Sequence, residues 1–226
     1  MAVKREEMMA AIRGRHSVRS YSDRPIGENV AASLRREIEA ANEECGLRMA
    51  LVLNEPKAFA GRMAKYGKFR NVKNYIAVIG KRRPHLNEDA GYGGERVVLK
   101  AQLLGLGTCW VGLTYSKRKS PVKIKRGEKL VCVIAVGYGE EPGRPHKSKS
   151  FKDVTDIGGE VSDAFRDGIE AALLAPTAVN QQKFRFLLEE DGTVHVKATG
   201  GFFSDVDLGI VARHFEAASG IPVKRY

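Results

Sequence analysis

The 226-residue sequence has little cysteine and no long apolar run. Its cysteines, Cys45, Cys109 and Cys132, are scattered and lack the Cys-x-x-Cys spacing of zinc sites and redox motifs. This pattern excludes a disulfide framework and favours a reducing compartment, so we expect a cytoplasmic protein. No stretch approaches the roughly 18 apolar residues of a membrane helix. Residues 1–7 are of mixed charge with no apolar segment behind them, which argues against a secretory signal.

Clustered histidines and paired carboxylates are also lacking. The five histidines lie far apart in the chain, without the His-Glu-x-x-His spacing of zinc enzymes. No Ser-His-Asp order stands out either, so we expect neither a metal site nor a protein nucleophile. The sequence is compatible with chemistry that a bound cofactor carries while the protein positions it.

Charge is unevenly distributed along the chain. There are 38 Lys and Arg residues against 27 Asp and Glu residues, a net charge of +11. Three segments contain basic residues and no acid, 56–83, 117–126 and 142–152, and the rest of the chain is net acidic. Such segments fit either an anionic ligand or solvated loops. Nucleic-acid binding would give strong salt dependence, but no nucleic-acid motif accompanies the segments, and we do not favour it.

Two parts of the sequence resemble each other. Residues 16–23 and 146–153 are both basic and rich in hydroxyl groups, with an aromatic residue at the sixth place and Asp at the end. Each runs into a segment with a single apolar stripe at helical spacing. Both of these helices contain Ile-Glu-Ala-Ala, at 38–41 and 169–172. A diverged duplication explains the recurrence better than chance does.

The remaining pattern supports the same division. Strands are expected at 48–53, 75–79, 130–136, 184–188 and 193–197, and further helices at about 94–104 and 207–218. Residues 137–149 are rich in glycine, proline and charge, as a boundary loop would be. We therefore predict two diverged halves, 1–140 and 141–226, packed as one unit.

Three motifs offer groups that bind a ligand. RHSVRSY at 15–21 places two guanidinium groups around a hydroxyl, which suits a phosphate, although a solvated turn has the same composition. APTAVNQQ at 175–182 presents hydroxyl and amide groups that match a heterocycle edge, or forms an ordinary polar connection. GLGTCWVG at 105–112 lets the backbone approach a flat ligand, or caps a helix with Trp110 in the core.

Together these motifs resemble the FMN-dependent nitroreductase family. DLG at 207–209 and VGYGEEPGRPHKSK at 136–149 are similar to further segments of that family. The resemblance implies an α+β fold with a mostly antiparallel central sheet flanked by helices. It also implies an FMN cofactor whose N5 carries the hydride, with no catalytic side chain from the protein.

The resemblance further implies which residues bind the flavin. Its phosphate and ribityl chain would be held by the first motif and the basic tail, and its ring would lie against the other two motifs. The residues at the corresponding positions are Arg15, His16, Ser17, Arg19, Lys147 and Lys149 for the phosphate end, and Val111, Gly112, Leu113, Pro176, Thr177, Ala178 and Asn180 for the ring.

The order of the motifs departs from the family. In ordinary members the Ala-Pro-Ser segment follows the first helix and serves the flavin of a partner subunit. Here residues 41–46 have lost that pattern, and the intact copy, with Thr177 in place of Ser, lies in the second half. The simplest hypothesis is a compact, internally duplicated nitroreductase in which two halves stand in for two subunits. It predicts a monomer, rather than a homodimer, with one FMN per chain.

The resemblance implies an NAD(P)H oxidoreductase. In the expected ping-pong cycle NAD(P)H reduces FMN and leaves, and a nitroaromatic, quinone or related small-molecule acceptor is then reduced in the same place. The alternative is a non-catalytic flavin-binding or sensor protein on the same scaffold, suggested by the degenerate segment at 41–46.

Overall fold

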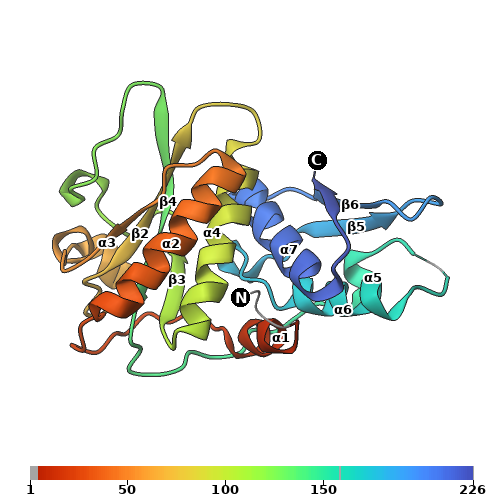
Figure 1. Ribbon diagram of the computed structural model, residues 1–226, viewed down its shortest axis with the longest axis horizontal. Helices are drawn as coiled ribbons and strands as arrows, with labels where there is room; N and C mark the ends of the chain where they lie inside the picture. The colour runs from red at the N-terminus through yellow and green to blue at the C-terminus, as the bar shows by residue number, and fades with distance from the viewer. Residues whose placement is uncertain (1–4, 158, 226) are drawn as a thin grey trace.

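The chain forms a four-stranded sheet and a three-stranded sheet, with long helices between them (Figure 1). The computed structural model describes residues 5–157 and 159–225. The strands are β1 (Ala50–Val52), β2 (Tyr75–Lys81), β3 (Gly107–Val111), β4 (Glu128–Gly137), β5 (Phe184–Leu188), β6 (Val194–Ala198) and β7 (Val223–Arg225). The α-helices are α1 (Arg5–Gly14), α2 (Glu28–Cys45), α3 (Arg62–Tyr66), α4 (Leu86–Leu103), α5 (Phe151–Val154), α6 (Asp163–Leu173) and α7 (Ser204–Ser219). Short 3-10 turns are η1 (Lys57–Phe59), η2 (Lys117–Lys119) and η3 (Ala178–Asn180).

The larger sheet is antiparallel throughout, in the order β1-β2-β4-β3. Its central strands β2 and β4 are continuous apolar runs because both of their faces are covered. Strand β3 lies at the edge, where Ser17 bridges Thr108. The predicted α+β class, with a mostly antiparallel sheet and flanking helices, is confirmed.

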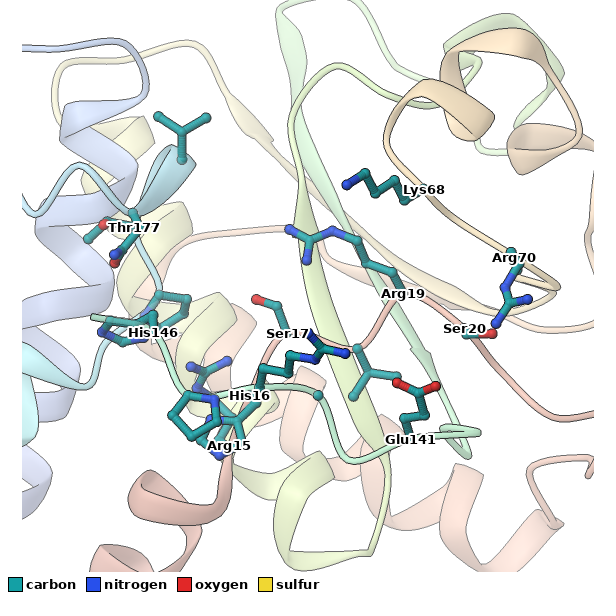
Figure 2. A pocket seen from close by; sticks show the side chains of 17 residues that line it. Arg15, His16, Ser17, Arg19, Ser20, Lys68, Arg70, Glu141, His146 and Thr177 are labelled. Carbon is teal, nitrogen blue, oxygen red and sulfur yellow. The ribbon is translucent and has the colours of Figure 1, made fainter. Parts of the chain in front are cut away.

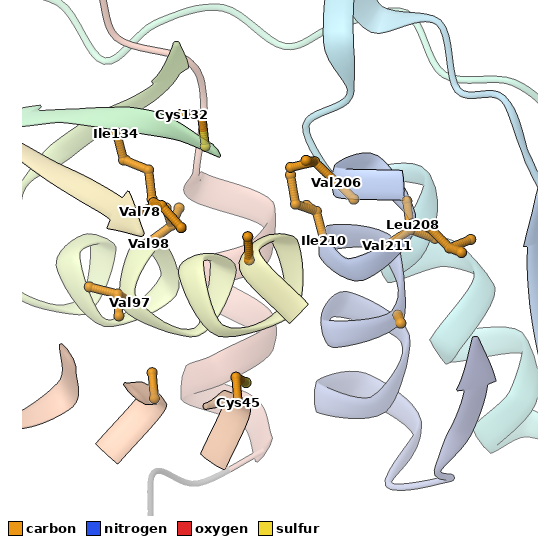
Figure 3. Packing of buried hydrophobic residues seen from close by; sticks show 14 of the residues in the cluster. Cys45, Val78, Val97, Val98, Cys132, Ile134, Val206, Leu208, Ile210 and Val211 are labelled. Carbon is orange, nitrogen blue, oxygen red and sulfur yellow. The ribbon is translucent and has the colours of Figure 1, made fainter. Parts of the chain in front are cut away.

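Helix α4 is the centre of the core. It packs against α2 on one side and α7 on the other, and α6 packs on α7. Figure 3 shows Val98 of α4 close to Val78 and Ile134 of the sheet, Val97 on the opposite side of α4, and Ile210 and Val211 on the neighbouring α7. All six side chains are almost fully buried, and each contributes roughly 1.5–3 kcal/mol by leaving water.

Helix α4 begins at Leu86, earlier than the predicted start near residue 94. The glycines at 91, 93 and 94 have low helix propensity and obscure the first turns in the sequence. Tertiary contacts explain why glycines occupy these positions. A Cβ on Gly91 would clash with the Val206 carbonyl oxygen of α7, and a Cβ on Gly94 would clash with the indole of Trp110.

The second part of the chain repeats the order of elements in the first. The series α6, β5, β6, α7, β7 has the same order as α2, β1, β2, α4, β3 once α3, which lies between β1 and β2, is left out, and both β1–β2 and β5–β6 are antiparallel pairs. Strands β6 and β7 are parallel. Strands β2 and β3 also run in one direction, since both are antiparallel to the β4 strand between them. Strand orientation is thus the same in the two series.

Within the described residues, no helix combines the length and the apolar character that a membrane crossing requires.

Candidate functional site

Two adjoining pockets lie where the first sheet meets residues 176–180 and the start of α7. One has a volume of about 650 Å³ and is lined mainly by basic and hydroxyl side chains, with the carboxylate of Glu141 among them; we call it the anion pocket. The other has a volume of about 390 Å³ and is lined by aromatic and aliphatic side chains; we call it the apolar pocket. Ser17, Arg19, Pro176, Thr177 and Val179 line both, so the two pockets form one continuous cleft.

The backbone of residues 15–21 forms one wall of the anion pocket. Helix α1 ends at Gly14, and the chain then runs beside β3, where the Val18 amide donates to the Thr108 carbonyl oxygen at 2.9 Å. The side chains of Val18 and Tyr21 are buried, and the Tyr21 hydroxyl donates back to the Val18 carbonyl oxygen at 2.8 Å. Because these two side chains point inward, Ser17 and Arg19 face the cleft.

The cations of the anion pocket differ in how they are compensated. Arg15 is only 3% exposed; its Nε is 3.9 Å from Glu95 Oε1 and has no hydrogen-bond acceptor within the described part of the chain. Arg70 pairs with Glu140 at 3.4 Å. Arg19 and Lys68 form no ion pair with any residue in 5–157 or 159–225, and Figure 2 shows both pointing into the cleft toward the side of Thr177. Buried or unpaired guanidinium groups of this kind suit a phosphate or carboxylate.

Two histidines complete the anion pocket (Figure 2). His146 Nε2 donates to the Leu173 carbonyl oxygen at 2.9 Å, which fixes its ring against the end of α6. Burial, reinforced by the positive charge of Arg15 and by His146, lowers the pKa of His16 below its ordinary value. A neutral imidazole therefore lies beside the cations at neutral pH.

The apolar pocket is built from the end of β3 and the start of α7. Trp110, Val111 and Gly112 form one side, and a Cβ on Gly112 would come within 2.5 Å of the Phe203 ring, so a side chain there would force that ring to move. At the mouth, Leu113, Val179 and Phe202 are 64%, 80% and 53% exposed. Large apolar side chains left in water around a pocket indicate a surface for an apolar ligand.

Residues 177–182 carry unusual backbone strain. Val179, Asn180 and Gln182 have φ angles of 46°, 57° and 45°, and a β-branched residue rarely adopts that conformation. Asp207 of α7 holds the segment, since it accepts hydrogen bonds from the Ala178 amide at 2.9 Å and from Gln181 Nε2 at 2.7 Å. Burial raises the pKa of Asp207 to about 6, although these hydrogen bonds oppose the shift. Strain held in this way is common at functional sites.

The structure brings most of the predicted flavin-binding residues to the cleft. The anion pocket includes Arg15, His16, Ser17, Arg19, Pro176, Thr177 and Asn180. The apolar pocket includes Val111, Gly112, Leu113, Pro176, Thr177 and Ala178. Their roles toward a ligand stay predictions.

Lys147 and Lys149 do not line either pocket. The Lys147 carbonyl oxygen accepts hydrogen bonds from Asn180 and from the buried Gln182, at 2.9 and 2.8 Å. Lys149 Nζ donates to the Gln182 carbonyl oxygen at 2.7 Å. In the structure these lysines fasten the boundary loop to the strained segment.

Several lining residues were not predicted from the sequence. They are Lys68, Arg70, Arg144 and His146 in the anion pocket, and Trp110, Phe202, Phe203 and Asp207 in the apolar pocket. All four basic ones lie in the acid-free segments 56–83 and 142–152, so the charge pattern indicated these segments without indicating which residues face the cleft. Phe202 and Phe203 precede a helix, and no motif or periodic pattern in the sequence marked them as pocket residues.

The fold is α+β, and its cleft joins a pocket rich in basic and hydroxyl side chains to an apolar one. A family model described as "Putative TM nitroreductase" matches residues 7–219, and the chain belongs to this nitroreductase family, a family of oxidoreductases. A comparison with curated proteins gave no match.

Solved structures show the same fold. A "putative nitroreductase" from Thermotoga maritima is 22% identical, with a TM-score of 0.69 over 96% of this chain and 86% of that one. A "putative nitroreductase in complex with FMN" from Desulfovibrio desulfuricans is 18% identical, with a TM-score of 0.55 over 69% of this chain and 97% of that one. A "putative NADH oxidase" from Clostridium acetobutylicum is 19% identical, with a TM-score of 0.51 over 66% of this chain and 99% of that one.

Proposed function

We propose that the protein is an FMN-dependent NAD(P)H oxidoreductase that reduces nitroaromatic, quinone or related acceptors. The observation that carries the proposal is the continuity of the two pockets: an anion pocket with unpaired cations opens into an apolar pocket through Ser17, Arg19 and Thr177. FMN has this same division between a phosphate and a flat ring system. The family and the FMN-bound structural neighbour support the assignment.

The residues present fit FMN. Arg15 has a buried Nε with no hydrogen-bond acceptor among the described residues, and Arg19 and Lys68 have no counter-ion there. These groups would hold the phosphate end. The apolar pocket of about 390 Å³, lined by Gly112 and Phe203 among others, offers space for a flat ring. When bound, FMN supplies the hydride and electron exchange, since flavin chemistry needs little from the protein beyond positioning.

The chain itself would bind the flavin, orient it and exclude water from it. Arg19 and Ser17 would donate charge-assisted hydrogen bonds to the phosphate. Trp110, Val111 and Phe203 would cover the ring and keep water from it. The exposed apolar mouth leaves an approach for NAD(P)H and then for the acceptor, one after the other, which is the order of a ping-pong cycle.

The proposal includes one site per chain, formed between halves 1–140 and 141–226. The recurring order and strand orientation of the elements support a duplication. Two neighbours matched over nearly their whole length cover about two thirds of this chain, so this chain is longer than either. We therefore propose a monomer. Three free, buried cysteines agree with the cytoplasmic location that we propose for it.

An absorbance spectrum of the purified protein with FMN, before and after addition of NADPH or NADH, tests the activity. Bleaching of the flavin band by a nicotinamide, followed by recovery on addition of a quinone, is expected. Flavin binding without bleaching by either nicotinamide would instead favour the non-catalytic binding protein. Light scattering with flavin quantification tests the site count: an obligate dimer with symmetric sites composed across chains contradicts the one-site proposal.

A further inference from the structure

A buried cluster links the back of the two pockets. Glu95 of α4 is fully buried, and its Oε2 accepts a hydrogen bond from Trp110 Nε1 at 2.8 Å. Its Oε1 is 2.8 Å from His214 Nε2 of α7 and 3.9 Å from Arg15 Nε. Trp110 lines the apolar pocket and Arg15 lines the anion pocket. The Glu95 carboxylate thus contacts one wall residue of the apolar pocket and one of the anion pocket.

The hydrogen bonds fix the proton count of the pair formed by Glu95 and His214. His214 Nδ1 is 3.0 Å from the Ala171 carbonyl oxygen, which only accepts, so Nδ1 carries a proton. The other ring nitrogen faces a carboxylate oxygen, which requires a second proton between Nε2 and Oε1. Glu95 and His214 together are therefore neutral, whichever of the two atoms holds that proton.

This count leaves Arg15 without a net negative partner among the described residues: its Nη2 donates to the Leu174 carbonyl oxygen at 3.5 Å, and its Nε lies 3.9 Å from the carboxyl group of the neutral Glu95–His214 pair. The guanidinium group stays protonated at all relevant pH values, and its side chain is 3% exposed. A buried cation of this kind is costly unless an anion lies close to it. That anion would bind in the anion pocket. A shift of Arg15 caused by its binding would change the contacts of Glu95 and therefore the hydrogen bond of Trp110.

We propose that Glu95 is a positioning residue that couples the two pockets. Its Oε1 sets the position of Arg15 at the base of the anion pocket, and its Oε2 sets the position of Trp110 in the wall of the apolar pocket. Filling the anion pocket draws Arg15 away from Glu95 and changes the hydrogen bond to the indole. The inference rests on the proposed function only in that the anion pocket accepts a phosphate group.

The sole tryptophan of the sequence makes this coupling measurable without a flavin. Inorganic phosphate is titrated into the flavin-free protein while tryptophan emission is recorded, with sodium chloride at matched ionic strength as the control. Thermal denaturation in the same buffers reports phosphate binding independently. Phosphate is expected to raise the melting temperature and to change the emission along one saturation curve.

The Glu95→Gln variant separates coupling from binding. Its amide oxygen still accepts from Trp110, and a neutral His214 tolerates the amide group, but the carboxyl oxygen that faces Arg15 Nε is replaced by an NH₂ group that cannot accept from it. Phosphate should still raise the melting temperature, while its effect on emission is lost. Glu88→Gln, on the same helix and outside both pockets, should respond as the wild type does.

If Glu95→Gln does not fold, the single indole N–H resonance of the ¹⁵N-labelled wild-type protein replaces it as the readout. This resonance must shift on addition of phosphate. The proposal is overturned if phosphate stabilises the wild type without moving its emission or its indole resonance, if Glu95→Gln responds as the wild type does, or if phosphate does not bind at all. Failure of the flavin assignment is seen separately, as the absence of a bound FMN spectrum.

Discussion

Gly91 of α4 and Gly209 of α7 lie against each other's helix backbone in a reciprocal contact. A Cβ on Gly91 would clash with the Val206 carbonyl oxygen, and a Cβ on Gly209 would clash with the Glu88 carbonyl oxygen. The partner carbonyl lies three residues before the partner glycine on both helices. The two helices therefore cross about a local twofold arrangement, as the proposed duplication requires.

Replacing either glycine by alanine should destabilise the protein by about 1–3 kcal/mol, because the added methyl group forces the helices apart. Helix propensity alone predicts the opposite sign, a gain of up to about 1 kcal/mol. Chemical denaturation of Gly91→Ala, Gly209→Ala and the double variant measures the effect. The double variant should cost less than the sum of its parts, since both changes widen one contact. Gly61→Ala, where a Cβ meets open space, serves as the control; a loss of equal size there would contradict the assignment.

Arg19→Ala should weaken FMN binding by about 1.5–3 kcal/mol if its guanidinium donates a charge-assisted hydrogen bond to the phosphate. Riboflavin, which lacks the phosphate, should lose much less affinity in the same variant. Titration of flavin fluorescence measures both constants. Arg36→Ala on the exposed face of α2 is the matched control. Unchanged FMN affinity in Arg19→Ala, with Arg15→Ala equally silent, would remove residues 15–21 from the site.

Asp207 should give stability a distinct pH dependence. Its pKa of about 6 in the folded protein lies above its ordinary 3.8, so the folded state takes up a proton before the unfolded chain does as the pH falls. Its unfavourable contribution is fully present above about pH 6 and is relieved toward pH 4. A shift of this size corresponds to roughly 3 kcal/mol.

Asp207→Asn removes this titration. The unfolding free energy of the variant minus that of the wild type should therefore rise by roughly 3 kcal/mol from about pH 4 to about pH 7. Urea denaturation across that range measures the difference. Asp205→Asn on the same helix is the control. A difference that stays flat with pH, or falls, would show that Asp207 is not desolvated in this way.

Val179→Asn should stabilise the protein by about 1 kcal/mol, because asparagine tolerates the φ of 46° that strains valine. Little burial is lost, since Val179 is 80% exposed. Leu113→Asn makes a similar change at an exposed residue of the same cleft that has no positive φ, and it should bring no gain. Thermal and urea denaturation compare the two variants; equal effects would show that backbone strain at Val179 is not the cause.

The sequence predicted the elements whose pattern is local. Strand β5 matches its predicted range, and β2, β4 and β6 differ by one or two residues at their ends. Apolar runs and periodicity decide such elements, so they can be found without the tertiary structure. The start of α4 could not be found in this way. Its glycines serve the close approach of α7 and Trp110, which local helix propensity does not contain.

The site shows the same division. The sequence alone determined which chemical groups are available: guanidinium and hydroxyl groups at 15–21, amides at 177–182 and glycines around Trp110. Which of these groups meet depends on how the chain packs in three dimensions. The tertiary structure places Lys68 and Phe202 in the cleft. It directs Lys149 to the Gln182 carbonyl oxygen instead, and it places Glu95 between Arg15 and Trp110. The reason is that side-chain direction and the crossing of α4 with α7 depend on packing between residues far apart in the chain, which no local pattern records.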